Sequence, residues 1–491
     1  IEARFEKQIA GVKGRELVQV DGRTDGIFTR VEREPIPGAS IELTIDTRLQ
    51  QVVERELEAG VRKAGALGGS AIILDPFTGE ILAQASYPTY NPNDPAASSA
   101  DARHNRAVQD IYEPGSTFKI VTASAALNEH VLTPSTLIDT NPGVITFPGR
   151  AKPIDEDKGH NYGVLSFEDV IVKSSNVGAV KIGLQVGVDR MMQYVRRFGF
   201  GKRIAPDYGG ESPGMLTPVP QINDSALASM SMGYQVGVTP IQMVTAASVV
   251  ANGGVLMQPH LVRAFIRDGR REEVAPKLLG RVISPETALT LTGIMEGVVD
   301  LPQGTGNEAQ LTRYQVAGKT GTAAKLEDRR YSEEDYNVSF VGFVPSRRPA
   351  FAILVVVDTP TTMPKYGGRV AAPIFRRIAE TALEYTGVAP TIDPTPPIMV
   401  ASDRRLLQPP VMVETPPVIT RVGGRPVMPD LRGLMLRDAI RIANALGLSP
   451  TTEGDGFVVS QTPAAGEFLS ESGRCTLVLR RATSKPAGGD R

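Results

Sequence analysis

The chain has 491 residues, more than one ordinary domain of roughly 100–200 residues would need, so we expect two or three domains. Its 53 Lys and Arg residues nearly balance 54 Asp and Glu, and the net charge of -1 argues against a nucleic-acid binder, which would carry a basic stripe. A single cysteine, Cys475, excludes an internal disulfide, and none of the four histidines has a partner at metal-ligand spacing, so no metal site is predicted.

The N-terminal region, residues 1–66, is predicted to be an accessory region. Residues 1–40 are charged and carry several Gly and Pro, and 47–66 has the pattern of an amphipathic helix. The chain begins at Ile1 rather than Met and contains no apolar run near the ~20 residues that span a bilayer. We therefore expect a processed or truncated form.

Residues 67–388 are predicted to form the main unit. SAIILD and EILAQAS, on either side of PFTG, indicate a hairpin over 70–86. Three more strands are predicted in QVAGKTGTAA, NVSFVGFVP and PAFAILVVVD, followed by an amphipathic helix over 372–387. Many helix signals lie between the two groups of strands. The expected fold class is α+β: an antiparallel sheet with strands from both ends of the unit, flanking helices and an inserted helical subdomain.

The C-terminal part is predicted to hold a linker, a small domain and a tail. Residues 389–426 contain nine of the 38 prolines and should form a semi-rigid extended linker. In 427–481 we predict a helix with Leu436, Ile440, Ala443 and Leu446 on its apolar face, ending at Gly447. The strands FVVSQTP and CTLVLRR follow, which makes this domain α+β. Residues 482–491 are a tail.

The segment YEPGSTFKIVTASAAL contains a candidate nucleophile. Ser116 is expected at the N-terminus of a helix running to about Leu127, where unpaired N–H groups favour a developing negative charge. Lys119 lies three residues on, on the same face, among small and apolar neighbours. Burial would lower its pKa and make it a neutral general base for the serine. The structural alternative is a serine that merely caps the helix.

Two further motifs follow in a fixed order. Ser174-Ser175-Asn176 is predicted where helices end or join, and its structural alternative is a cap or turn. Lys319-Thr320-Gly321-Thr322 is predicted on a strand edge, and its alternative is an exposed turn with a solvated lysine. The set Ser-x-x-Lys, Ser-Asp-Asn and Lys-Thr-Gly is the signature of penicillin-binding proteins and class A β-lactamases. Here the middle motif has Ser in place of Asp.

With these motifs in place, the chain resembles a class B penicillin-binding protein of the division (FtsI-like) type. The resemblance includes LTIDTRLQ, SYPTYNPN, NRAVQDIYEPGSTFK, KSSNVG, VTPIQM and AGKTGTA, and VMPDLRGLMLRDAIRIANALGL with VVSQTPAAGEFL resembles a PASTA module. It implies a penicillin-binding transpeptidase fold over 67–388, a truncated pedestal over 1–66 and a PASTA domain over 427–481. It also implies the extracytoplasmic face of a bacterial cytoplasmic membrane, with a single-pass anchor lost upstream of Ile1.

The resemblance also implies a reaction, the crosslinking of D-Ala-D-Ala stem peptides by a D,D-transpeptidase. By motif, Ser116 would be the nucleophile, Lys119 its proton acceptor, Ser174 a proton relay and Asn176 a ligand of the substrate amide. Lys319, Thr320 and Thr322 would meet the terminal carboxylate and tune the field, and Gly321 would bind substrate with the two threonines. The N–H groups of Ser116 and Thr322 would form the oxyanion hole. No metal or cofactor is implied. The implied partners are a donor stem peptide, an amine acceptor, β-lactams, a membrane glycan polymerase and other division proteins, without nucleic acid.

Several alternatives stay open at this point. A β-lactamase is disfavoured because no Glu-x-x-x-Asn lies between the second and third motifs and because the chain has several domains. A D,D-carboxypeptidase, or a β-lactam sensor that never turns over, would keep all three motifs. The elongation branch of the family shares the motifs too. For the PASTA module, binding of peptidoglycan fragments and a spacer role are equally compatible with the sequence.

Overall fold

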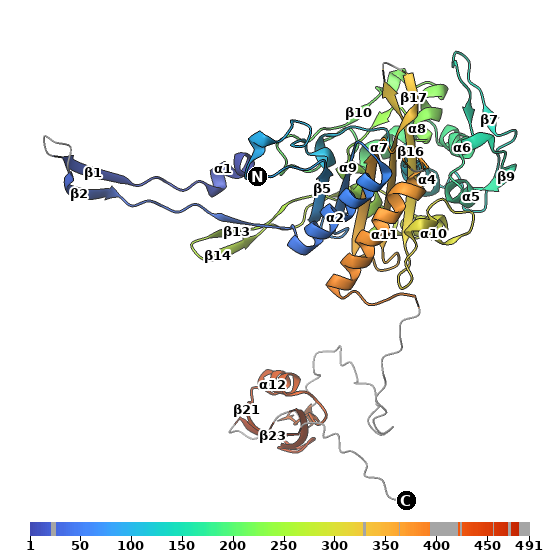
Figure 1. Cartoon of the computed structure of the whole chain (residues 1–491). Coiled ribbons are helices and arrows are strands. Elements are labelled where there is room, and N and C mark those ends of the chain that lie inside the picture. Colours follow the sequence, from blue (N-terminus) through green and yellow to red (C-terminus); the bar gives the residue numbers. More distant parts are fainter. Residues whose placement is uncertain are drawn as a thin grey trace, which may run out of the picture. The chain divides into compact units, whose positions relative to one another are not determined.

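A computed structural model describes residues 1–20, 26–327, 330–362, 364–392, 421–422, 425–454, 456–469 and 473–480. The chain divides into two compact units, residues 1–395 and 396–491, which are described separately (Figure 1). Most of the linker predicted over 389–426 and the whole tail predicted over 482–491 lie outside the described residues.

The N-terminal region contains more regular structure than predicted. Its elements are α1 (Glu2–Ile9), β1 (Arg15–Val20), β2 (Gly26–Arg33), β3 (Ser40–Leu43) and α2 (Thr47–Ala64). β1 and β2 pair as an antiparallel hairpin, and β3 joins β13 (Val262–Arg267) and β14 (Arg270–Glu273) in a three-stranded sheet. On α1, the Phe5 ring lies 5.8 Å from that of Phe265 on β13. The domain boundary at residue 66 stays a prediction.

A five-stranded antiparallel sheet forms the centre of the first unit (Figure 1). Its order is β16 (Ala317–Glu327), β17 (Arg330–Val344), β18 (Phe351–Asp358), β4 (Gly68–Leu74) and β5 (Ile81–Tyr87). β4 of the early hairpin thus pairs with β18 from the far end of the unit, as predicted, with Leu74 opposite Ala352 and Gly68 opposite Asp358. β16 is an edge strand, so one side of its backbone has no strand neighbour in this sheet.

The two faces of the sheet bury different cores. On β18, Ile353 and Val355 face the core shared with α2 and α11 (Gly367–Thr386), whereas Leu354 and Val356 face the core of the inserted helices. This alternation follows from the two-residue period of a strand. The sheet is therefore a middle layer with helices on both faces.

Both predicted flanking helices exist, with different bounds. α2 ends two residues before the predicted end at 66, because Gly65 takes a left-handed conformation (φ +58°) that terminates it. α11 begins five residues before the predicted start at 372. Proline favours the first position of a helix, but Pro373 lies in the second turn of α11 instead.

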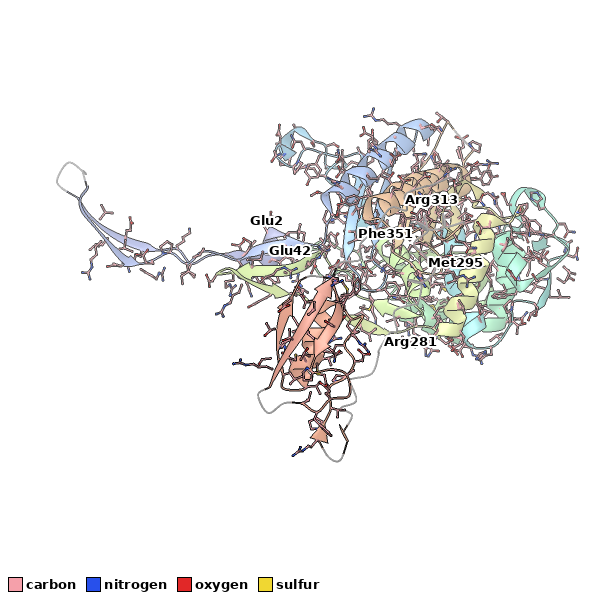
Figure 2. All side chains as sticks on the ribbon, turned by 90° about the horizontal axis from the view of Figure 1, so that it is seen from below. Glu2, Glu42, Arg281, Met295, Arg313 and Phe351 are labelled. Carbon is pink, nitrogen blue, oxygen red and sulfur yellow. The ribbon has the colours of Figure 1, made fainter. Side chains whose placement is uncertain are left out.

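The segment between β5 and β16 holds most of the α-helices of the first unit's described residues, as predicted. Its helices are α3 (Arg106–Gln109), α4 (Lys119–Asn128), α5 (Phe167–Val172), α6 (Asn176–Val186), α7 (Val188–Arg197), α8 (Asp224–Ser231), α9 (Pro240–Ala251) and α10 (Pro285–Asp300). Short ribbons accompany them: β6 (Leu137–Asp139) with β9 (Val164–Ser166), β7 (Val144–Ile145) with β8 (Ile154–Asp155), β10 (Met215–Leu216) with β11 (Val236–Gly237), and β12 (Val255–Met257) with β15 (Leu278–Arg281). Met295 of α10 and Phe351 at the start of β18, both labelled in Figure 2, are buried.

The second unit is a small α+β domain. It contains β19 (Arg421–Val422), β20 (Arg425–Pro426), α12 (Leu436–Ala445), β21 (Ser449–Glu453), β22 (Phe457–Thr462) and β23 (Arg474–Arg480), with the sheet order β21-β23-β22. On α12 the core includes Ala439 and Ala443, with Leu436, Ile442 and Leu446 packed against it, so the assignment of Ile440 to that face was wrong. β21, which runs parallel to β23, was not predicted. No helix in the described part of the chain combines the length and apolarity needed to cross a bilayer.

Candidate active site

Ser116 lies in a tight turn rather than in the first turn of an α-helix. The turn is the 3₁₀ helix η2 (Gly115–Phe118), and α4 begins only at Lys119, so the helix predicted from Ser116 starts three residues late. The Thr117 hydroxyl donates to the Pro114 carbonyl at 2.8 Å, and the Gly115 N–H donates to the Gly233 carbonyl at 3.1 Å. The first bond closes the turn, and the second ties it to the residue that follows the C-cap of α8.

Lys119 is fully buried, as predicted. Its Nζ donates to the Ser174 carbonyl at 2.6 Å and to Asn176 Oδ1 at 3.0 Å, and it lies 3.3 Å from Ser174 Oγ. Burial lowers the pKa of Lys119 to about 7, although the negative charges of Glu156 and Asp157 oppose the shift. The side chain is thus poised to be neutral near physiological pH.

The Ser174-Ser175-Asn176 motif links α5 to α6 through a strained residue. Ser174 has φ +60°, a left-handed conformation that costs a non-glycine residue roughly 1–3 kcal/mol. Ser175 caps α6 by accepting from the Gly178 N–H at 2.9 Å. The cap interpretation is therefore correct for Ser175, whereas the side chains of Ser174 and Asn176 face the lysine.

The carboxylate of Glu156 holds this motif in place. Glu156 is 2% exposed and accepts from the Ser175 hydroxyl, from the Asn176 N–H at 2.6 Å and from the Val177 N–H at 3.3 Å. A carboxylate at a helix N-terminus satisfies donors that the helix cannot pair and interacts favourably with its dipole. Glu156 therefore supports both the strained Ser174 and the start of α6.

Lys319, from the third motif, contacts the Ser174 hydroxyl as well. It lies on the edge strand β16, is fully buried, and donates from Nζ to Ser174 Oγ at 2.9 Å and to the Thr320 carbonyl at 3.3 Å. The alternative of an exposed turn with a solvated lysine is excluded. Burial, with the nearby positive charge of Lys119, lowers the pKa of Lys319 well below its usual range. Two ammonium groups so close together cannot both stay charged without a large cost, so the pair titrates as a unit.

Neighbouring groups orient the two threonines of the third motif. The Thr320 hydroxyl lies 2.7 Å from that of Thr305, and Thr322 Oγ1 accepts from the N–H of Gly367, the first residue of α11, at 3.1 Å. Because the Gly367 N–H occupies one lone pair of the Thr322 hydroxyl oxygen, the hydroxyl proton points away from Gly367. It is therefore free to donate to a ligand in the site.

Gly321 allows the nucleophile turn to approach β16. A Cβ on Gly321 would lie 2.3 Å from Ser339 Oγ and 2.9 Å from the Pro114 carbonyl oxygen, closer than real Cβ contacts. Gly115 makes the reciprocal approach, since its Cβ would lie 2.8 Å from the Thr322 carbonyl oxygen. These glycines place the turn that carries Ser116 directly against the third motif.

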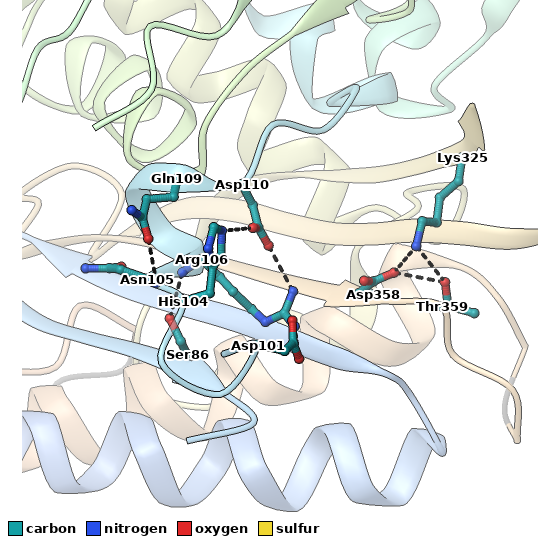
Figure 3. Close-up of polar contacts among 10 residues, drawn as sticks. All are labelled: Ser86, Asp101, His104, Asn105, Arg106, Gln109, Asp110, Lys325, Asp358 and Thr359. Carbon is teal, nitrogen blue, oxygen red and sulfur yellow. Dashed lines mark hydrogen bonds and ion pairs between the residues drawn. The ribbon is translucent and has the colours of Figure 1, made fainter. Parts of the chain in front are cut away.

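An ionic network fastens the segment that leads into Ser116 (Figure 3). Arg106 of α3 donates from Nη1 to Asp110 at 3.0 Å and from Nη2 to Asp101 at 2.8 Å. Its backbone N–H donates to Ser86 Oγ on β5 at 3.1 Å. The loop after β5 is thereby tied to the sheet before the chain enters the site.

A second ion pair in the same view fixes β16 beyond its motif. Lys325 donates to Asp358 on β18 at 2.8 Å, reaching over β17 (Figure 3). Asp358 in turn is in register with Gly68 of β4. The edge strand is therefore held to the centre of the sheet by a side chain as well as by its backbone.

The structure brings the predicted site residues together. Direct hydrogen bonds join Lys119, Ser174, Asn176 and Lys319, while Ser116 reaches the group through its turn packing on β16. Thr320, Gly321 and Thr322 continue the same strand. Glu156, Thr305 and Gly367 were missed. In the described residues, no three His, Cys, Asp or Glu side chains are grouped to hold a metal ion.

Comparisons with known proteins place this geometry in a wider context. A family model for the penicillin binding protein transpeptidase domain matches residues 69–380, and one for the PASTA domain matches residues 426–479. The chain is 30% identical over 493 residues to stage V sporulation protein D of Bacillus subtilis, covering 99% of this chain and 73% of that protein. It is 33% identical over 390 residues to a probable peptidoglycan D,D-transpeptidase, PbpC, of Pseudomonas aeruginosa, covering 79% of this chain and 66% of that protein.

Solved structures agree with the sequence relatives. Penicillin binding protein 3 of Mycobacterium tuberculosis, crystallised in complex with aztreonam, is 29% identical with a TM-score of 0.68, over 78% of this chain and 89% of that one. These similarities confirm the family resemblance, the α+β fold class and the PASTA module expected from the sequence. The individual roles of the site residues stay predictions.

Replacing Glu156 tests its supporting role. Glu156→Gln should lower the free energy of unfolding by about 2–4 kcal/mol. The change replaces one carboxylate oxygen by an NH₂ group, so buried donors of the second motif lose an acceptor. It should also lower the pKa of Lys119 further, since the Glu156 charge raises it. Urea denaturation and NMR titration of the lysine side chains measure the two effects.

Glu211→Gln is the matched control for this experiment. Glu211 is also buried and accepts from two backbone N–H groups, those of Ile204 and Ala205, but it does not touch the lysines. It should lose stability and leave the pKa of Lys119 unchanged. An unchanged pKa in Glu156→Gln as well would contradict the assigned role.

Proposed function

The chain belongs to the penicillin-binding protein transpeptidase family, and from this premise we propose that it is a peptidoglycan D,D-transpeptidase acting through an acyl-enzyme on Ser116. One observation supports the proposal most strongly. The Nζ atoms of two buried lysines from different motifs share the Ser174 hydroxyl, beside the turn that carries Ser116. A serine nucleophile requires a base that is neutral at working pH, and this pair supplies one.

The first half-reaction forms the acyl-enzyme. Ser116 Oγ attacks the carbonyl of the penultimate D-Ala, and neutral Lys119 accepts the hydroxyl proton. The N–H groups of Ser116 and Thr322 stabilise the oxyanion, each donor contributing about 10²–10³ in rate. As the C–N bond breaks, the Ser174 hydroxyl passes its proton to the amine of the departing D-Ala and takes a proton from Lys119, which returns to the neutral form. Asn176 holds the substrate amide.

The substrate carboxylate has a further effect on the lysine pair. Bound at the Thr320 and Thr322 hydroxyls, it adds a negative charge on the Lys319 side of Ser174. That charge favours the ammonium form of Lys319, and repulsion between neighbouring cations then favours neutral Lys119. Binding of the correct substrate would thus place the proton shared by the two lysines on Lys319 and leave Lys119 neutral, ready to accept the proton of Ser116.

The second half-reaction resolves the acyl-enzyme. An amine from a neighbouring stem peptide attacks the ester carbonyl, Lys119 accepts the amine proton, and the C–O bond to Ser116 breaks to restore the hydroxyl. A β-lactam carries a strained amide and a nearby anionic group, so it would acylate Ser116 in place of the donor. The relative crystallised with aztreonam, a monocyclic β-lactam, supports this part of the proposal.

Three alternatives compete with this function. Attack by water in the second half would make the chain a D,D-carboxypeptidase, and rapid attack on a penicilloyl ester would make it a β-lactamase. Absence of any deacylation would make it a β-lactam sensor. The relative named as a probable D,D-transpeptidase favours transfer to an amine.

We further propose that the reaction serves septal wall synthesis at the extracytoplasmic face of the membrane, with a membrane glycan polymerase and other division proteins as partners. The support is the division-type sequence pattern around the motifs. Loss of the gene should then give filaments with blocked septa, seen by microscopy with a fluorescent wall label. Rounded cells would indicate the elongation branch instead, and a defect confined to spores would follow the relative named for stage V sporulation.

Covalent labelling tests the nucleophile. After incubation with penicillin, mass spectrometry of the intact chain should show one adduct that lasts many minutes, and Ser116→Ala should abolish it. Ser124→Ala is the matched control, because Ser124 lies on α4 with a buried hydroxyl that has no hydrogen-bond partner among the described residues. It should label normally. An adduct that persists in Ser116→Ala would refute the assignment, and rapid release would indicate a lactamase.

The pH dependence of acylation tests the base. The pKa of Lys119 is lowered to about 7, so the neutral form dominates above that pH. The acylation rate should therefore rise through about pH 7 and fall about tenfold per unit below it, as expected for a single essential base. Asp157→Asn removes a charge that raises this pKa, so its profile should shift to lower pH. Asp189→Asn, at an exposed position of α7, should leave the profile in place; a shift of equal size in both variants would contradict the interpretation.

A further inference from the structure

A second cavity lies apart from the lysine site. It has a volume of about 770 Å³ and is bounded by the end of α7, the turn that follows it, β12 and β15. Its walls include the apolar side chains of Met192, Ile204 and Leu256, which are buried. No residue of the three motifs lines it.

The cavity is strongly cationic. Five of its fifteen lining residues are Arg or Lys, against 53 of 491 in the chain as a whole, and its one acidic residue is Asp189. The cations are Arg196, Arg197, Lys202, Arg203 and Arg281. In a chain of net charge -1, this is a marked local excess of positive charge.

None of these five cations forms an ion pair within the described part of the chain. Three guanidinium groups are instead held by neutral partners. Arg281 (labelled in Figure 2) donates to the carbonyls of Gly253 at 2.7 Å and Ile283 at 3.2 Å. Arg203 donates to the backbone oxygen of Glu211, and Arg197 lies over the Tyr194 ring. Such partners orient a guanidinium without forming an ion pair with it. The charges of Arg203 and Arg281 also favour the ionised carboxylates of Glu211 and Glu286, which lie near them but outside ion-pair distance.

Stabilisation of the fold explains the position of only some of these five cations. Arg196 and Arg197 lie in the last turn of α7, where cations stabilise the helix dipole. Arg281 of β15 donates to the Gly253 carbonyl, just beyond the end of α9, but Lys202 and Arg203 come from a turn, and no helix end accounts for these two. Convergence of three separate elements on one concavity points to a ligand.

We propose that this cavity binds a small multivalent phosphorylated ligand. Guanidinium groups match phosphate oxygens in bidentate geometry, and several cations that form no ion pair among the described residues suit a ligand with more than one negative charge. The volume falls within the range of small-molecule pockets, roughly 300–1,000 Å³. The apolar wall offers contact to an uncharged part of the ligand. A concave site of this size favours a small molecule over a flat anionic membrane surface.

Calorimetric titration of the full chain with inorganic pyrophosphate tests the proposal. We expect saturable binding at one site that weakens as salt rises. The variant Arg196→Gln/Lys202→Gln removes two side chains for which no partner is seen among the described residues, so it should fold normally. It should bind pyrophosphate at least about tenfold more weakly, because charge-assisted hydrogen bonds are lost. Arg190→Gln, on the same helix but outside the cavity, is the matched control and should bind like the parent chain.

Three results would overturn the proposal. The first is no saturable binding of pyrophosphate at millimolar concentration, and the second is equal binding by the parent chain and the double variant. The third is binding to vesicles of anionic phospholipid that requires Arg196 and Lys202 while pyrophosphate neither binds nor competes, which would make the patch a membrane contact. Penicillin labelling of Ser116 in each variant shows that the rest of the unit is intact, so failure here leaves the proposed transpeptidase function untouched.

Discussion

The burial of two lysine side chains against one serine hydroxyl is the constraint on which the candidate site depends. An ammonium group away from water is costly unless it is paired, and two of them near one oxygen raise the cost further. The chain accommodates the arrangement by surrounding Lys119 with neutral acceptors and by holding Ser174 in a left-handed conformation that presents both its carbonyl and its hydroxyl. The strain at Ser174 and the buried Glu156 beneath it are consequences of this requirement.

The sheet topology makes that convergence possible. The three motifs are separated by 55 and by 145 residues along the chain. They meet because β16 is an edge strand of a sheet whose other strands come from both ends of the unit, so the inserted helices can pack against its open side. Gly321 and Gly115 let the two backbones approach within a distance that any Cβ would prevent. Positioning by strands and packed helices is more exact than positioning by loops, which suits a site whose proton must move between fixed atoms.

The sequence predicted the elements and residues that carry a local signal. Strand-type runs separated by turn residues identified the five strands, amphipathic patterns identified the flanking helices, and apolar neighbours identified the burial of Lys119. The sequence did not predict residues whose burial or position depends on contacts with distant parts of the chain. Glu156 sits in the charged run IDEDK, which has the composition of an exposed loop, and only the packing of α6 buries it. Thr305 and Gly367 carry no motif at all, and the cations around the second cavity come from segments up to 85 residues apart.

The pKa values of Lys119 and Lys319, the two lysines that contact Ser174, are set by different groups. Burial alone would push the pKa of Lys119 further down, and the charges of Glu156 and Asp157 bring it back to about 7. A base is most effective when its pKa lies near the working pH, because a lower value weakens its affinity for the proton and a higher one leaves it charged. Lys319 has no such carboxylate among the causes of its shift, only burial and the charge of Lys119. The carboxylates of Glu156 and Asp157 therefore adjust the pKa of Lys119. The pKa of Lys319 would instead respond to the negative charge of a bound substrate.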